Sequence, residues 1–298
     1  GLFTDRAINI VGTNHLYPMT FPFTFTNAGK TGGYGPTLSE LRTAYTPTWT
    51  DYTSNLNMTA QGVQEWTVPQ TGSYEIDVYG ARGRGSNSGA DTGYYGKGAR
   101  MKGRFSLTEG QILKIVVGQE GYLGPNDSAN YGGTGGGGTF VYTGTTPLII
   151  AGGGGGGSII NSTATSGGGN LLSETIGRDG QITTAGTLFN YNSTDSTKSA
   201  KHDSWYRADN GASGGNWWGS YAAAYELNSV SGGYSVGGGR GWTQAMATNF
   251  YVVSTAGHAS AFSGANGVYT GGFGGGNGTN NHCGGGGGGY SGGGSTNY

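Results

Sequence analysis

The chain has 298 residues, of which 67 are Gly and only 7 are Pro. Its 15 basic and 16 acidic residues give a net charge of -1, which excludes the strongly basic surface expected of a nucleic-acid-binding protein. The glycines come in clumps rather than at every third position, which excludes collagen. No apolar stretch approaches the about 18 residues that a membrane span needs, so we expect no membrane insertion.

The N-terminal residues predict strand structure. Residues 1–20 contain apolar side chains without clear periodicity, and we interpret them as a first strand or an N-terminal connecting segment. Phe21, Phe23 and Phe25 then alternate with Pro and Thr, which predicts a half-buried strand that turns at residues 27–29.

Residues 36–45 predict the one helix of this chain, a short helix of about two turns. Thr37 is the expected N-cap, and Glu40 stands at the position that completes a capping box.

Further strand patterns follow, separated by turn residues. Two adjacent strands are joined by a turn at residues 70–72, and a second strand-turn-strand unit bends at residues 108–110. Short strands at this spacing favour an antiparallel β-sandwich. The predicted strands are residues 62–69, 74–79, 101–107, 112–117, 140–142 and 148–150.

Glycine dominates the second half, with 47 of the 67 glycines after position 130. Such runs are typical of flexible linkers. If the runs are ordered, their backbone groups must pair with neighbouring segments at very close range, as polyproline II strands without Cβ atoms permit. We therefore predict a connecting segment at 1–20, a β-sandwich with interleaved glycine strands at 21–150, and a glycine-rich polyproline II bundle with surface loops at 151–298.

The order of these motifs resembles a known family, the glycine-rich extracellular domain of anaplastic lymphoma kinase and leukocyte tyrosine kinase. Similar domains occur in phage tail-fibre and bacterial surface proteins. The resemblance implies an all-β fold with almost no α-helix: an antiparallel, jelly-roll-like sandwich similar to tumour necrosis factor, fused to a bundle of glycine polyproline II helices. The motifs that carry it are Phe25-Thr26, Gly29, Gly32, Gly35-Pro36-Thr37 and residues 62–69, 71–74, 79–81, 116–121, 135–141, 147–151 and 271–276, with Cys283.

Two features depart from the kinases. They carry cysteines where this chain has Ala28 and Leu41, and because this sequence shows no kinase segment after Tyr298 we expect that it is not a receptor kinase. Cys283 is the single cysteine, so no intrachain disulfide can form, which favours folding in a reducing cytoplasm.

Motifs that suggest catalysis lack the context that catalysis needs. Three G-x-S-x-G stretches, at residues 211–215, 233–237 and 289–293, have no strand before them and no helix after them. Asp91-Thr92-Gly93 has no second copy to supply the paired carboxylate of an aspartic protease. His282 beside Cys283 is too small a set for a metal site. We expect no enzyme activity, no cofactor and no metal.

An aromatic group is the best candidate binding site. Its members fall between glycine runs, where exposed rings could stack on sugars, although they could instead cap the ends of the glycine bundle. The candidate residues are Trp205, Tyr206, Trp217, Trp218, Tyr221, Tyr225 and Trp242.

These features favour a non-enzymatic adhesin or receptor-binding module of a virion or fibre, whose loops near 187–231 and 242–263 contact a cell-surface receptor or glycan. The alternative is a structural subunit of an extracellular filament or virion decoration that packs against copies of itself. Ice binding by a Thr-bearing face is a third reading. In the first two cases we expect a homo-oligomer or part of a larger fibre, located outside the cell or on the virion surface.

Overall fold

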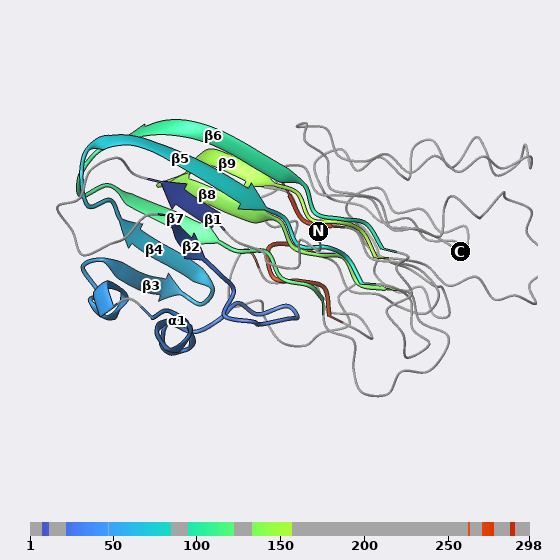
Figure 1. Ribbon diagram of the computed structural model, residues 1–298. Helices are drawn as coiled ribbons and strands as arrows, with labels where there is room; N and C mark the ends of the chain where they lie inside the picture. Colours follow the sequence, from blue (N-terminus) through green and yellow to red (C-terminus); the bar gives the residue numbers. More distant parts are fainter. Residues whose placement is uncertain are drawn as a thin grey trace, which may run out of the picture.

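The computed structural model describes residues 8–11, 22–46, 48–84, 95–121, 133–156, 262, 270–276 and 287–289. In these residues the strands form two antiparallel sheets, of order β2-β1-β5-β6 and β3-β4-β7-β8-β9 (Figure 1). The strands are β1 (Ile8–Val11), β2 (Phe23–Phe25), β3 (Leu56–Ala60), β4 (Val63–Thr67), β5 (Gly72–Tyr79), β6 (Arg100–Leu107), β7 (Ile112–Val116), β8 (Thr139–Thr143) and β9 (Thr146–Ala151).

The two sheets share one hydrophobic core. Phe25 and Ile76 of the first sheet and Trp66, Leu113 and Val141 of the second belong to the same cluster of buried side chains. Helical structure is limited to α1 (Leu38–Ala44) and the 3-10 turn η1 (Thr48–Asp51) in the described part. In the described residues, the predicted antiparallel β fold with very little helix is therefore confirmed.

Local sequence signals gave β2 and α1 correctly. Phe23 and Phe25 are buried while Thr24 between them is not, as alternation predicted. At the start of α1, the hydroxyl of Thr37 accepts a bond from the amide of Glu40, and the carboxylate of Glu40 accepts one from the amide of Thr37, at 2.8 Å. This reciprocal pair is the predicted capping box.

A buried polar network fixes the end of α1 to both sheets. The hydroxyl of Tyr45 accepts a bond from the amide of Thr26, just after β2, and donates to the side-chain oxygen of Gln64 in β4, at 2.7 Å. The side-chain nitrogen Nε2 of Gln64 donates in turn to the backbone carbonyl of Thr26, at 2.8 Å. Burial also raises the pKa of the Tyr45 hydroxyl, which therefore stays neutral.

The predicted neighbours β4 and β5 do not pair with each other. β4 pairs with β3 and β7, whereas β5 pairs with β1 and β6 in the other sheet. The chain crosses between sheets again from β6 to β7. A turn signal in the sequence marks where the chain bends but not which strands pair. β4 and β5 face each other across the core, and their apolar side chains are buried between the two sheets. β8 and β9 do form a hairpin, with Gly144 at φ 54 in the turn, and β3 and β4 form another, with Gly62 at φ 81.

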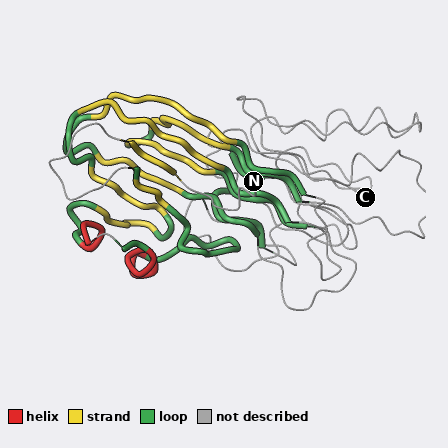
Figure 2. The backbone as a smooth tube through the Cα atoms, in the orientation of Figure 1, coloured by secondary structure: helices red, strands yellow, loops and turns green. Residues whose placement is uncertain are grey.

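Short glycine-rich segments extend from the sandwich (Figure 2). Residues 80–84, 117–121 and 152–156 continue β5, β7 and β9, and residues 95–99 and 133–138 lead into β6 and β8. Their backbone bonds recur every three residues on both partners, unlike a β-ladder, which repeats every two. Three pairs of segments show this spacing. The amides of Gly80 and Gly83 bond to the carbonyls of Ala99 and Gly96. Those of Ala81 and Arg84 bond to Gly137 and Thr134, and those of Ala99 and Gly96 bond to Gly152 and Gly155.

These segments leave no space for a side chain at many glycines. A Cβ atom at Gly137 would overlap the carbonyl oxygen of Phe273, and one at Gly98 would overlap the carbonyl oxygen of Gly80. In both cases the obstacle is backbone, which cannot rotate away as a flexible side chain could. We call this set of segments, residues 80–84, 95–99, 117–121, 133–138, 152–156, 270–276 and 287–289, the glycine array.

Replacing Gly137 by Ala is therefore expected to lower the free energy of unfolding by at least about 3 kcal/mol, because the new methyl group forces backbones apart. Gly72→Ala is the matched control, since its nearest neighbour would be a ring carbon of Tyr74 at 3.8 Å, an ordinary contact. Urea denaturation followed by fluorescence measures both. Equal stability of the two variants would contradict the close approach at Gly137.

Thr37→Ala is expected to lower the free energy of unfolding by about 1 kcal/mol, because it removes the N-cap of α1. Ser39→Ala, in the same helix and on its exposed side, should leave stability within about 0.5 kcal/mol of the original. Thermal unfolding followed by circular dichroism distinguishes the two. A loss of the same size in both variants would mean that the capping box does not stabilise the helix.

Candidate functional site

The aromatic residues that the sequence proposed as a binding site lie outside the described residues. These residues are Trp205, Tyr206, Trp217, Trp218, Tyr221, Tyr225 and Trp242. Asp91-Thr92-Gly93, the histidines, Cys283 and all of the G-x-S-x-G stretches except Gly289 also lie outside them. These interpretations stay predictions.

The described structure shows where the chain between the glycine segments is attached. The amide of Arg84 bonds to Thr134, and that of Gly96 bonds to Gly155, so the ends of four glycine segments distant from the sandwich lie together. A Cβ atom at Gly121 would meet the side chain of Thr134, which places a fifth end beside them. Residues 85–94, 122–132 and those that follow Gly156 are thus joined to the array at this distal end.

A partly buried ion cluster lies in the array near the same end. The Glu120 side chain, 8% exposed, accepts a bond at 2.8 Å from the guanidinium of Arg82, and a guanidinium nitrogen of Arg84 lies 3.4 Å from its other oxygen. Arg82 also stacks over the ring of Tyr95, 4.5 Å from its centroid. These contacts join residues 80–84, 95–99 and 117–121 through side chains as well as through backbone bonds.

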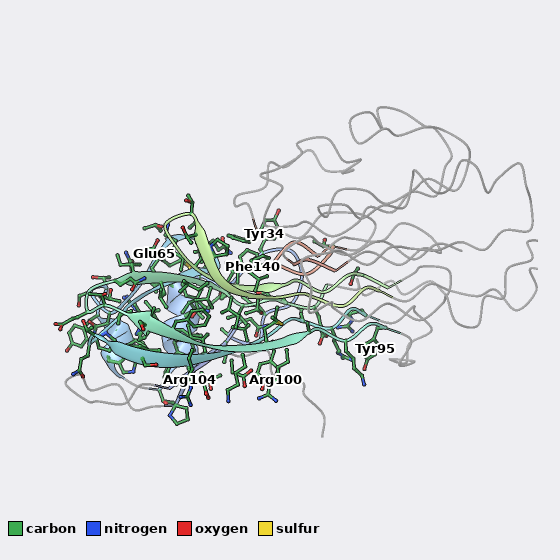
Figure 3. All side chains as sticks on the ribbon, turned by 90° about the horizontal axis from the view of Figure 1, so that it is seen from above. Tyr34, Glu65, Tyr95, Arg100, Arg104 and Phe140 are labelled. Carbon is green, nitrogen blue, oxygen red and sulfur yellow. The ribbon has the colours of Figure 1, made fainter. Side chains whose placement is uncertain are left out.

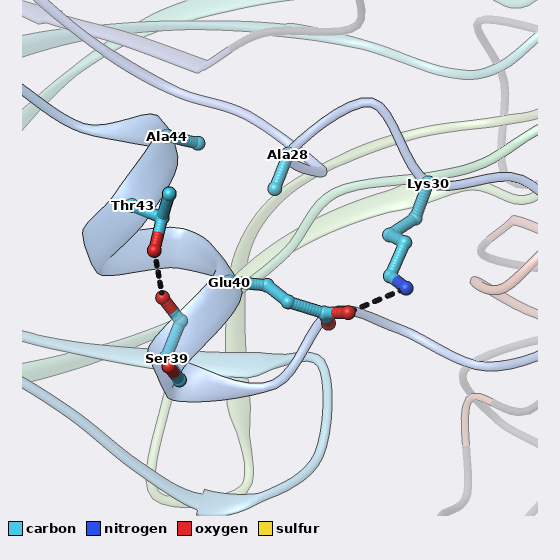
Figure 4. A pocket seen from close by; sticks show the side chains of 6 residues that line it. All are labelled: Ala28, Lys30, Ser39, Glu40, Thr43 and Ala44. Carbon is cyan, nitrogen blue, oxygen red and sulfur yellow. Dashed lines mark hydrogen bonds and ion pairs between the residues drawn. The ribbon is translucent and has the colours of Figure 1, made fainter.

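A shallow cavity of about 330 Å³ lies between α1 and the turn at residues 27–30 (Figure 4). The turn brings Ala28 and Lys30 to it, with Ala28 at φ 52 and Gly29 at φ 71, as in a type I′ turn. The helix contributes Ser39, Glu40, Thr43 and Ala44.

The ion pair across this cavity controls its electrostatics. Nζ of Lys30 lies 2.6 Å from Oε1 of Glu40. The hydrogen bond from Lys30, followed by the backbone bond from Thr37, holds the pKa of the Glu40 carboxyl below its ordinary value of 4.5. The cavity therefore presents small side chains beside a paired cation and anion.

Two other properties bear on function. In the described ranges, no group of three or more His, Cys, Asp or Glu side chains is placed to hold a metal ion. No helix found there is long and apolar enough to cross a membrane.

Sequence reasoning did not single out the outer face of β6. It predicted this strand but not that Arg100, Lys102 and Arg104, at alternate positions, would all project from the outer face of the sheet. The alternation of cations within a strand pattern was the available signal.

Comparison with known proteins gives a partial match. No protein-family model matches the chain. The chain is 35% identical over 101 residues to the leukocyte tyrosine kinase receptor of Mus musculus. The match covers 34% of this chain and 11% of the receptor, so it relates a segment of the two proteins. It agrees with the resemblance stated from the motifs.

The ion pair at the cavity predicts a pH dependence. Because the pKa of Glu40 is lower in the folded state, its contribution to stability is present above pH 4.5 and is lost as the pH falls through the depressed pKa. In Glu40→Gln, the free energy of unfolding should fall less between about pH 6 and about pH 3 than in the original chain. Urea titrations at both pH values measure this.

Lys30→Gln provides the matched variant, since it removes the largest cause of the lowered Glu40 pKa. In this variant the loss of stability on acidification should occur closer to pH 4.5. If Glu40→Gln had the same pH dependence as the original chain, Glu40 would not contribute to it.

Proposed function

We propose that the glycine array is a polyproline II bundle and that the sandwich has the jelly-roll topology of tumour necrosis factor. The three-residue repeat of backbone bonds supports the first part, because a polyproline II helix has three residues per turn. The crossing of β4 to β5 and of β6 to β7 between the two sheets supports the second part.

On this scaffold we propose a non-enzymatic adhesin or receptor-binding module. The observation that carries the proposal is the exclusion of Cβ atoms from the array. The glycines of the array carry no side chains for recognition, so we expect most recognition to come from the residues joined to the array, and the distal end gathers several of these attachments. A rigid support lowers the conformational entropy lost when such residues bind a partner.

The expected partner is a cell-surface receptor or glycan, contacted by the aromatic side chains from Trp205 to Trp242. The expected location is extracellular or on a virion surface such as a tail fibre, after folding in a reducing cytoplasm. The partial match to a receptor tyrosine kinase supports a role in recognition outside the cell.

The test compares binding with assembly. The purified chain, fluorescently labelled, is applied to a printed glycan array and to bacterial and eukaryotic cells. We expect saturable binding that weakens at least about tenfold in Trp217→Ala/Trp218→Ala, because stacked rings supply much of the contact energy. Tyr52→Ala is the matched control, since Tyr52 is a 64% exposed ring on the sandwich and should leave binding unchanged.

Light scattering and negative-stain images of the same sample test the alternative function, a structural subunit of a filament or virion decoration. Extended polymers without binding to cells or glycans would overturn the adhesin and favour a structural subunit.

A further inference from the structure

The outer face of β5 and β6 carries a row of ionic side chains. In the antiparallel register, Glu75 lies opposite Arg104, Asp77 opposite Lys102 and Tyr79 opposite Arg100. Alternate residues of a strand project from the same face, about 6.6 Å apart, so the three cations of β6 form a line. The inference does not rest on the proposed function, because none of these residues belongs to the aromatic group proposed as the adhesin site.

The cations of this row remain accessible although acids lie beside them. The side chains of Arg100, Lys102 and Arg104 are 53%, 49% and 79% exposed. Arg100 pairs closely with Asp77, at 2.6 Å, whereas Glu75 is shared by Lys102 at 2.7 Å and Arg104 at 3.4 Å. Two carboxylates thus serve three cations, and Arg104 is the most exposed and the least closely held.

The row continues beyond the sheet. The hydrogen bonds from the amide of Gly80 to the carbonyl of Ala99 and from that of Gly83 to Gly96 continue the register of β5 and β6 into the array. Tyr95 lies on the same side of the molecule as Arg100 and Arg104, opposite the side of Glu65 and Phe140 (Figure 3). Arg82 covers the Tyr95 ring at 4.5 Å, and Arg100 lies 5.1 Å from the centroid of Tyr79. From Arg104 to Tyr95 the row spans about 30 Å by residue spacing.

We propose that this cationic row, formed by Arg100, Lys102 and Arg104 and flanked by Arg82, whose side chain is 27% exposed and bonds to Glu120, binds a linear acidic polysaccharide that carries carboxylate groups. Guanidinium and ammonium groups would bind the carboxylates, with Arg104 providing the most accessible fork. Glu75 and Asp77 would accept hydrogen bonds from sugar hydroxyls between the charged units.

The interleaved acids favour a glycan over a nucleic acid. Glu75 and Asp77 are hydrogen-bond acceptors, and a DNA backbone offers no hydroxyl group to donate to them, whereas each sugar of a polysaccharide offers free hydroxyls. The absence of apolar surface disfavours a folded protein partner. The large exposed hydrophobic side chains in the described part are Tyr34, Tyr52 and Ile112, and none belongs to the row, whereas a stable protein interface buries an apolar centre.

The test uses the full chain and polygalacturonate, a linear polymer of carboxylated sugars, in biolayer interferometry at low and physiological salt. We expect binding to polygalacturonate and none to neutral dextran or to fully methyl-esterified polygalacturonate, which keeps the polymer but removes its charge. Lys102→Gln/Arg104→Gln should weaken binding about tenfold, because two exposed charge contacts are lost.

Lys114→Gln is the matched control, since it removes a cation 3.6 Å from Glu65 on the opposite face and should leave binding unchanged. Circular dichroism verifies that each variant is folded. Equal binding to the methyl ester, equal loss in Lys114→Gln, or no loss in the double variant would overturn the proposal. Equally tight binding to duplex DNA would replace it with a nonspecific polyanion surface.

The outcome is independent of the adhesin test. Trp217→Ala/Trp218→Ala should retain polygalacturonate binding, and Lys102→Gln/Arg104→Gln should retain binding through the aromatic loops.

Discussion

Backbone segments in this protein approach one another so closely that no Cβ atom fits between them. At Gly137, the space that a side chain would fill is occupied by the carbonyl of Phe273. Residues 133–138 lie at the centre of this packing, because their backbone groups bond to residues 80–84, 117–121, 152–156, 270–276 and 287–289. The hydrogen bonds compensate for the backbone entropy that Gly loses on ordering. Most of the other features follow from this constraint.

One large side chain joins the glycine array to the sandwich. The Phe273 ring fills the space above Gly35 and Gly62, where a Cβ atom would meet it. It belongs to a second buried cluster with Val116 and Phe140 on the outer face of the second sheet. Its amide bonds to Gly32, and its carbonyl accepts from Gln119. The sequence motifs that contain these residues thus meet around Phe273, which connects the glycine array to the sandwich.

The two parts present different kinds of surface. The array can support loops but has few side chains of its own, whereas the sandwich presents ordinary alternating faces. Its outer face at β5 and β6 is polar and ionic, with Glu75 and Asp77 beside the cations of β6. The cavity beside α1 is lined by small side chains and one ion pair.

The sequence by itself determined the β-rich fold class and the local structure of β2 and α1. The alternation around Phe23 and Phe25 and the capping box at Thr37 are recognisable because they depend on residues near in sequence. It did not reveal β3, whose residues Leu56–Ala60 have weak strand propensity and form a sheet edge. Only the tertiary structure decided that β4 and β5 lie in different sheets and that the cations of β6 form an exposed row, because pairing and exposure depend on packing across the core.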